Sequence, residues 1–447
     1  MSVVPAPRTR EAEAEVGPHR LLPSPGRGES RRPREHRPRE HRPRGHRPPA
    51  PGPGPARSAA HRLLASVSAN DRTVLALYLL TRAGIWITAY CTGWLFTGDG
   101  RAKEAPPLLS RWEQWDWSYF VRIAQYGYFG GPDGSGSAPP DNREAFFPGL
   151  PLLLRVVHTV VPDWTVAGLL ISLAAGAVAV LALARIARLH LATTEGVPGQ
   201  GDPGEHAVFF LLLSPCAVFL AVGYTEALFL ALALPAWLAA KKGRWPLAAV
   251  LACCATTVRI SGLFLAAALA VEFLTATGLR GRLRALPWLA LPAVPALAYT
   301  WYLHARTGDW MAWKHAQERG WYRQFHTPWE AWRNTWDSAF SHTQTTGYAF
   351  MFRAELVAMV VGLLLLVRLL QRRRWPEAVY IALTLWALGT SYWYMSIPRA
   401  TLLWWPLWIG LARWTLHRPW IRTAYVCLSA PLMTVLAVAF TSGRWAG

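Results

Sequence analysis

Charged residues are scarce in this sequence, and their scarcity argues against a chain built from ordinary soluble domains. Aspartate, glutamate, lysine and arginine make up 16% of the 447 residues, whereas about a quarter is usual in soluble proteins. Apolar residues make up 52%, and apolar runs of about 17 to 25 residues, long enough to cross a bilayer, recur along the chain. The composition therefore predicts an all-α protein that crosses the membrane many times.

The sequence also lacks cysteines spaced as in a metal site or a disulfide framework, and it lacks Asp-X-Asp pairs. The five cysteines lie in apolar stretches, without the spacing of a metal site or a disulfide framework, and are interpreted as packing residues. No Asp-X-Asp pair occurs, so nothing supports a metal-bound nucleotide sugar. We predict no metal site and no cofactor.

Positive charge, by contrast, is abundant. The net charge of +20 would suggest nucleic acid as a partner in a soluble protein. In a membrane protein, basic residues mark the cytoplasmic loops instead, so we predict a bilayer and no nucleic acid. Residues 1–70 contain the imperfect repeat REHRPREHRPRGHRP and little that could form a core. We expect a disordered basic cytoplasmic tail over 1–70, attracted to anionic lipids, and a membrane domain over 71–447.

The apolar runs predict about eleven transmembrane helices. The expected spans lie near 73–96, 164–184, 206–222, 224–240, 245–258, 261–279, 285–303, 348–370, 375–393, 399–415 and 422–441. The segment 146–161 is short and contains Arg155 and His158, which indicates an interfacial or re-entrant helix. With eleven crossings, every basic cluster falls on the side of the tail, as the positive-inside rule requires. We therefore expect a multi-pass protein of the cell membrane with a long first extracytoplasmic loop over 97–163.

One stretch of this first loop contains a candidate catalytic acid. In RWEQWDWSYFVRIAQYGY (111–128), Asp116 stands between Trp115 and Trp117. Aromatic residues concentrate at the boundary between membrane and water, where a carboxylate can meet a lipid head group. Asp116 could act as a general base that accepts the proton of an attacking hydroxyl. A helix N-cap or a solvated loop acid remains the alternative.

Further ionisable residues reach the same outer boundary. Arg259 in TTVRISG and Arg399 in SIPRA offer planar, bidentate donors for a phosphate, or they extend to the interface as snorkelling side chains. Tyr224 and Glu226 lie in GYTEALF, where Glu226 could cap a helix or pair with one of these arginines. Several ionisable groups on one face are what a lipid-linked phosphate substrate requires. The residues predicted to bind substrate here are Trp115, Tyr119, Tyr224, Glu226, Arg259 and Arg399.

The second long loop, 304–346, offers groups for an acceptor site. They lie in the motif TGDWMAWKHAQERGW (307–321) and are Asp309, His315, Gln317 and Trp321. The alternative is a packed surface loop without contact to a substrate.

Taken in order, several motifs resemble the PIG-V-type GPI mannosyltransferase family and its bacterial relatives. They are WDWSYFVRIAQYGY, FFPGLPLL, SPCAVFLAVGYTEALF, TTVRISG, TGDWMAWKHAQERGW and SIPR, and the resemblance covers residues 75 to 440. It implies a membrane glycosyltransferase of the GT-C type with an extracytoplasmic site. Members take mannose from a polyprenyl- or dolichyl-phosphate carrier and invert the anomeric centre. The family's first-loop acid maps onto Asp116.

The sequence departs from the family pattern close to this acid. Trp117 stands where small residues are common, Tyr119 where histidine often occurs, and Phe120 and Ala400 where tyrosine is usual. These departures bear on the identity of the acceptor more than on the chemistry of transfer. The composition resembles that of actinobacterial proteins, so the expected acceptor is a bacterial glycolipid, glycan or protein rather than a GPI anchor.

Two other functions remain open. A flippase or transporter of lipid-linked sugars would also need a charged outward cavity, although its usual internal repeats are not evident here. A membrane scaffold that recruits partners through the basic tail would explain the tail but not the outer motifs. The predicted function is an inverting mannosyltransferase that uses a polyprenyl-phosphate-linked sugar donor and a lipid or glycan acceptor.

Overall fold

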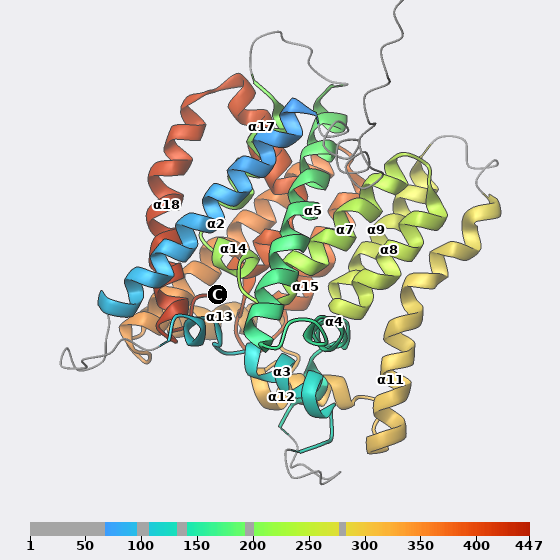
Figure 1. Cartoon of the computed structure of the whole chain (residues 1–447). Helices are drawn as coiled ribbons and strands as arrows, with labels where there is room; N and C mark the ends of the chain where they lie inside the picture. The colour runs from blue at the N-terminus through green and yellow to red at the C-terminus, as the bar shows by residue number, and fades with distance from the viewer. Residues whose placement is uncertain (1–67, 96–106, 132–140, 193–200, 277–282) are drawn as a thin grey trace, which may run out of the picture. The chain divides into compact units, whose positions relative to one another are not determined.

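The computed structural model describes residues 68–95, 107–131, 141–192, 201–276 and 283–447, and in these ranges every regular element is a helix (Figure 1). This confirms the all-α prediction for the described part of the chain. The predicted tail lies outside the described residues, apart from its last three positions, 68–70.

Among the described residues, four helices are long and apolar enough to cross a membrane. They are α2 (Ala69–Leu95), α5 (Trp164–Ala192), α14 (Thr346–Gln371) and α18 (Trp420–Thr441). Leucines on the outer faces of three of them are largely exposed, at 71% for Leu80, 65% for Leu364 and 71% for Leu428. Large exposed apolar surfaces mark contact with a membrane or a partner. The fold fits a helical membrane protein.

Each of the other predicted spans also contains helix, but in shorter pieces. These pieces are α6 (Pro203–Leu212), α7 (Thr225–Lys241), α8 (Trp245–Val258), α9 (Ser261–Thr275), η4 (Leu283–Ala293), α11 (Val294–Thr307), α15 (Trp375–Gly389) and α17 (Trp405–His417). The number of eleven crossings and the orientation stay predictions.

Prolines explain where the predicted spans differ from the observed helices. The expected continuous helix at 206–222 is interrupted: α6 ends at Leu212, ahead of Pro215, and a separate 3₁₀ turn, η3, covers Ala217–Leu220. Proline disfavours helical backbone in the residue before it and lacks an N–H donor. Pro287 and Pro292 likewise lie within the 3₁₀ segment η4. The predicted start at 399 falls in the short α16 (Ile397–Ala400), and η5 (Thr401–Leu403) separates α16 from α17.

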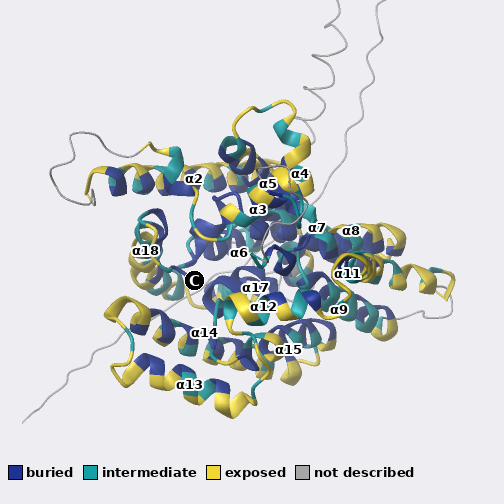
Figure 2. Ribbon diagram, turned by 90° about the horizontal axis from the view of Figure 1, so that it is seen from below, coloured by how far each residue is buried: buried dark blue, intermediate teal, exposed yellow. Residues whose placement is uncertain are grey.

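Short helices from the two long loops gather at one end of the longer ones (Figure 1). The first loop contributes η1 (Leu109–Trp112), α3 (Trp117–Tyr126), η2 (Arg143–Ala145) and α4 (Gly149–His158), and the second contributes α12 (Ala312–Trp321) and α13 (Pro328–Phe340). The ten residues of α4 agree with a short helix at 146–161. Figure 2 shows buried residues on α6 and α17 and exposed residues along the outer side of α13.

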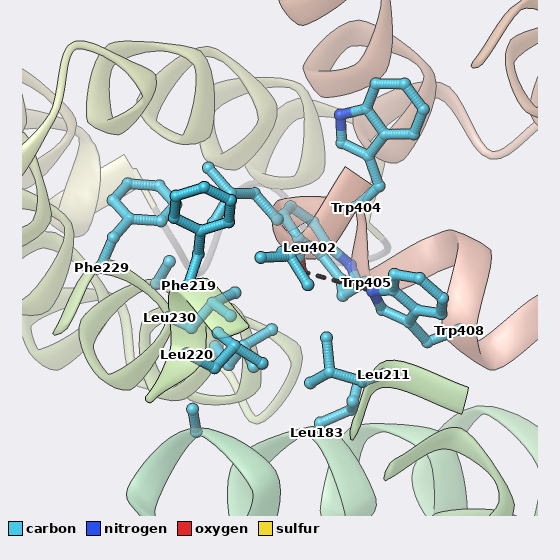
Figure 3. Packing of buried hydrophobic residues seen from close by; sticks show 14 of the residues in the cluster. Leu183, Leu211, Phe219, Leu220, Phe229, Leu230, Leu402, Trp404, Trp405 and Trp408 are labelled. Atoms are coloured by element: carbon cyan, nitrogen blue, oxygen red, sulfur yellow. Dashed lines mark hydrogen bonds between the residues drawn. The ribbon is translucent and has the colours of Figure 1, made fainter. Parts of the chain in front are cut away.

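A tryptophan-rich core holds the segments that carry the site. Trp405 is 1% exposed, and its ring lies 5.2 Å from that of Trp237 and 4.5 Å from that of Tyr380. Trp408 donates a hydrogen bond to the Leu402 carbonyl at 3.3 Å, the dashed line in Figure 3. Leucines from three other elements complete this cluster: Leu183, Leu211 and Leu230. The core therefore fixes the chain directly after Arg399 against α5, α6 and α7.

Candidate active site

A cavity of about 570 Å³ lies where the two long loops meet the ends of the longer helices. Its wall combines aromatic rings with charged and polar groups from distant parts of the chain. Of the residues predicted from the sequence, the lining includes Trp115, Asp116, Tyr119, Tyr224, Arg259, Gln317 and Arg399. The fold thus brings together residues that are nearly 300 positions apart.

A tight turn presents Asp116 to this cavity. Trp115, just before it, adopts a left-handed backbone with φ of 49°, which is uncommon for a residue other than glycine. The Asp116 N–H donates to the Tyr224 hydroxyl at 3.1 Å, and that hydroxyl donates to the Gln114 carbonyl at 2.5 Å. Tyr224 therefore ties the turn to the start of α7.

The side chain of Asp116 does not cap a helix. Asp116 directly precedes α3, but its carboxylate accepts no capping hydrogen bond. It accepts instead from Arg399, with 2.9 Å between Asp116 Oδ2 and Arg399 Nη1. The capping interpretation of Asp116 is wrong: its backbone is already helical, with φ of −59° and ψ of −21°, whereas a capping residue is typically extended.

Asp116 is the first member of a chain of alternating charges. Arg399 donates its Nε–H to Glu226 Oε1 at 2.6 Å, and the same carboxylate oxygen accepts from Arg259. Arg259 also donates to the Thr225 hydroxyl at 2.6 Å. Glu226 is completely buried, so two arginines compensate a charge that would be costly alone. The predicted pairing of Glu226 with one of the arginines is confirmed, and it extends to both.

Two aromatic rings pack against the Arg399 guanidinium. The guanidinium carbon lies 4.7 Å from the centre of the Phe219 ring and 4.9 Å from that of Tyr224. Arginine favours such faces because the ring quadrupole attracts a cation. The contact leaves little freedom for the side chain that holds Asp116.

Glu355 of α14 was not singled out by the sequence analysis, yet it shapes the Arg399 segment. Its two carboxylate oxygens accept the N–H groups of Ser396 and Ile397 at 2.6 and 2.8 Å. Ser396 has a left-handed φ of 67°, so the carboxylate stabilises a strained turn directly before Arg399. The signal in the sequence was a lone acid within an apolar span, which usually has a specific partner.

An aromatic wall joins the two long loops beside Asp116. Tyr119 stacks on Phe146, with 5.0 Å between ring centres, and lies 5.7 Å from Trp321. Gln317 donates its side-chain amide to the Ala145 carbonyl at 2.9 Å. Burial, followed by the negative charges of Asp141 and Asp116, raises the pKa of Tyr119 above its usual range. Tyr119 therefore enters any chemistry as a neutral hydroxyl.

His315 lies outside the lining of the cavity. It is exposed, and its Nδ1 is 2.6 Å from Asp309 Oδ2. This contact with His315 is the main reason why the pKa of Asp309 lies below its usual value. The structure thus separates His315 from Gln317 and Trp321, and its acceptor role stays a prediction.

Metal-ligating side chains do not gather at this site. In the described ranges, no three histidine, cysteine or acidic side chains come close enough to hold an ion. The charges that the described lining offers a substrate are those of Asp116, Arg259, Arg399 and one further arginine, Arg323. The groups present can orient a hydroxyl, accept its proton and bind an anion.

The fold and the cavity together define the class: a helical membrane protein with a polar, aromatic-walled site where its two long loops meet. Residues 102–279 match the family described as mannosyltransferase (PIG-V), which confirms the predicted resemblance over that segment. The segment is less than half of the chain, and it contains Asp116, Tyr224, Glu226 and Arg259. The motifs at 307–321 and 396–399 lie beyond it.

A curated relative points the same way. The GPI alpha-1,6-mannosyltransferase 2 of Cricetulus griseus is 32% identical over 163 residues. The alignment covers 35% of this chain and 30% of the relative, so the chain matches under a third of that relative's length.

Proposed function

We propose that this protein is an inverting mannosyltransferase of the cell membrane. It moves mannose from a polyprenyl-phosphate-mannose donor to an extracytoplasmic glycolipid, glycan or protein acceptor. The observation that carries the proposal is the Asp116 carboxylate, held by Arg399 on the wall of an aromatic cavity within a family-matched segment. The carboxylate supplies a base, and the fixed arginines beside it supply an anion site in the same cavity.

Asp116 acts as the general base. Its Oδ2 is engaged by Arg399, and the carboxylate accepts the proton of the acceptor hydroxyl as that oxygen attacks the anomeric carbon. The bond from this carbon to the phosphate oxygen breaks, and its electron pair leaves with polyprenyl phosphate. Attack from the side opposite the leaving group inverts the anomeric centre.

Arg259 and Arg399 contact the phosphate with the N–H groups that Glu226 and Asp116 leave available. Each arginine has five N–H donors, and the ion pairs use only some of them. The remaining donors are already oriented, so they stabilise charge on the leaving phosphate without reorganisation. Trp115, Tyr119 and Gln317 form the wall along which the sugar and the acceptor lie.

The test measures transfer of radiolabelled mannose from polyprenyl-phosphate-mannose to endogenous acceptors in membranes. Asp116→Asn keeps the size of the side chain but removes the base, so we expect transfer to fall by about 100-fold or more. Asp337→Asn, at an exposed position on α13 outside the cavity, is the matched control and should transfer as the wild type does.

Equal label with Asp116→Asn and wild type, at equal protein levels, would remove Asp116 from the mechanism. No label with the wild type would refute the donor or acceptor class. The flippase alternative would then be tested by following movement of the labelled lipid across the bilayer.

A further inference from the structure

The arginines assigned to the carrier phosphate are already compensated by protein carboxylates. Arg399 contacts both Asp116 and Glu226, and Arg259 contacts Glu226. Two positive charges therefore face two negative ones in this chain of ion pairs. A phosphate that enters beside it meets hydrogen-bond donors but little net positive charge, and charge complementarity is a large part of phosphate binding.

Arg323 differs from these two arginines. It lines the same cavity, and within the described part of the chain it has neither a salt bridge nor a hydrogen bond. Glu355, the acid that acts on it most strongly, gives both carboxylate oxygens to backbone N–H groups. Arg323 is partly exposed, so its five unused donors are open to a ligand that enters the cavity. Arg323 is thus the cation that this cavity leaves for a ligand.

The backbone around Arg323 is held in place, so the side chain is not on a free loop. Tyr322 adopts a left-handed φ of 53°, and its carbonyl accepts the Tyr392 N–H at 3.3 Å. Three residues after Arg323, the His326 N–H donates to the Thr390 carbonyl at 2.8 Å. The Tyr322 ring also packs 5.3 Å from that of Trp393. These contacts fasten residues 322–326 to the chain between α15 and α16, with Arg323 in the cavity lining.

We infer that Arg323 is the residue that selects a phosphate-linked polyprenyl chain over an uncharged one and stabilises the phosphate released by transfer. The identity of the ligand rests on the proposed function; the anion site rests on the charges just described. A sugar phosphodiester carries one negative charge, whereas the phosphate monoester that leaves carries about 1.5 to 2 near pH 7. An uncompensated arginine therefore stabilises the leaving group more than the substrate, which is the condition for lowering the barrier.

The experiment compares two probes of equal chain length, a short polyprenyl phosphate and the corresponding polyprenol. Their affinities are measured by quenching of tryptophan fluorescence in the purified full-length protein. The wild type should prefer the phosphate by about tenfold or more, because hydrogen bonds between charged groups are stronger than those between neutral ones. Arg323→Gln should lose most of this preference, and Arg323→Lys, which keeps the charge but not the planar fork, should retain part of it.

Arg319→Gln is the matched control. Arg319 lies four residues earlier on α12, is exposed, donates to Asn142 at 3.1 Å and is not part of the cavity lining. Its substitution should leave the preference for phosphate unchanged. Thermal unfolding of each variant in the same detergent reports whether it is folded. If Arg323→Gln does not fold, the lysine variant decides: an undiminished preference contradicts the role of Arg323, and a weakened one supports it.

Two results would overturn the inference: a wild type that binds both probes equally, or an Arg323→Gln variant that keeps the full preference for phosphate. The proposed function can fail separately. If mannose is not transferred but phosphate selectivity still depends on Arg323, the anion site stands and the transferase assignment falls. If transfer depends on Asp116 but the preference for phosphate does not depend on Arg323, the transferase assignment stands and the anion site at Arg323 falls.

Discussion

On the scale of single residues, Glu226 links Arg259 to the ion pair of Arg399 and Asp116. Its carboxylate is fully buried and accepts from Arg259 and from Arg399. Removing one partner of a buried ion pair leaves the others uncompensated, which costs far more than the loss of a surface pair. Through Arg399, the same carboxylate also sets the position of Asp116.

Glu226→Gln should therefore destabilise the protein and impair transfer. We expect a loss of about 3 kcal/mol or more in the free energy of unfolding, because buried Arg399 and partly buried Arg259 both lose the carboxylate that they share. The control is Glu318→Gln, in the more exposed pair of Lys314 and Glu318, which are 3.4 Å apart; such pairs contribute little. Thermal unfolding of both variants in one detergent measures the contrast. Similar melting temperatures would contradict the importance of the buried network.

The start of α3 depends on close packing between elements. The Trp117 ring, only 4% exposed, lies against Gly168 of α5 and Gly223 just before α7. A Cβ added at Gly223 would lie 2.4 Å from Trp117, and one added at Gly168 would lie 2.5 Å from it. The two glycines have no side chains and so make room for the large Trp117 ring between two other segments of the chain.

Gly223→Ala should displace Trp117 and, with it, the neighbouring Asp116. Overpacking of this kind costs about 1 to 3 kcal/mol, so we expect a lower melting temperature and weaker mannose transfer. Gly84→Ala is the control: a Cβ there meets nothing within 4 Å, and alanine in a helix is neutral or slightly stabilising. If both variants have the same melting temperature and the same rate of mannose transfer, the packing of Trp117 against Gly223 does not constrain the site.

On the scale of the whole molecule, the described helices bring the residues of the candidate site together at one cavity. The backbone N–H of Asp71, in the first turn of α2, donates to the Ser68 hydroxyl at 3.1 Å, so one donor at the start of this helix is satisfied within the described part of the chain. The described residues that line the cavity all lie between Trp115 and Gly447.

Deletion of residues 1–67 should leave mannose transfer intact in membranes that contain equal amounts of protein. The tail's attraction to anionic lipids is a surface effect, weakened by salt, and is not part of the catalytic groups. The measurement is transfer of labelled mannose by the truncated and the full-length protein. Loss of all transfer by a folded truncated protein would favour the scaffold alternative.

Several features of this protein follow from local sequence alone. Apolar length predicted helix within all the expected spans, because an apolar stretch in a bilayer must satisfy its backbone hydrogen bonds internally. Asp116, Arg259 and Arg399 stood out as ionisable groups at span boundaries, and all three line one cavity. The interruption near Pro215 was missed because the apolar run continues past it, although proline itself marks the break.

The tertiary structure alone decided which charges are compensated. Asp116 and Arg399 are 283 positions apart, and Arg399 and Glu226 are 173 apart, so no periodicity along the chain encodes either contact. For the same reason, the sequence did not distinguish Arg323 from the paired arginines, or reveal that Glu355 holds the turn before Arg399. The strength of an ion pair depends on distance and burial, and both arise only when distant helices pack together.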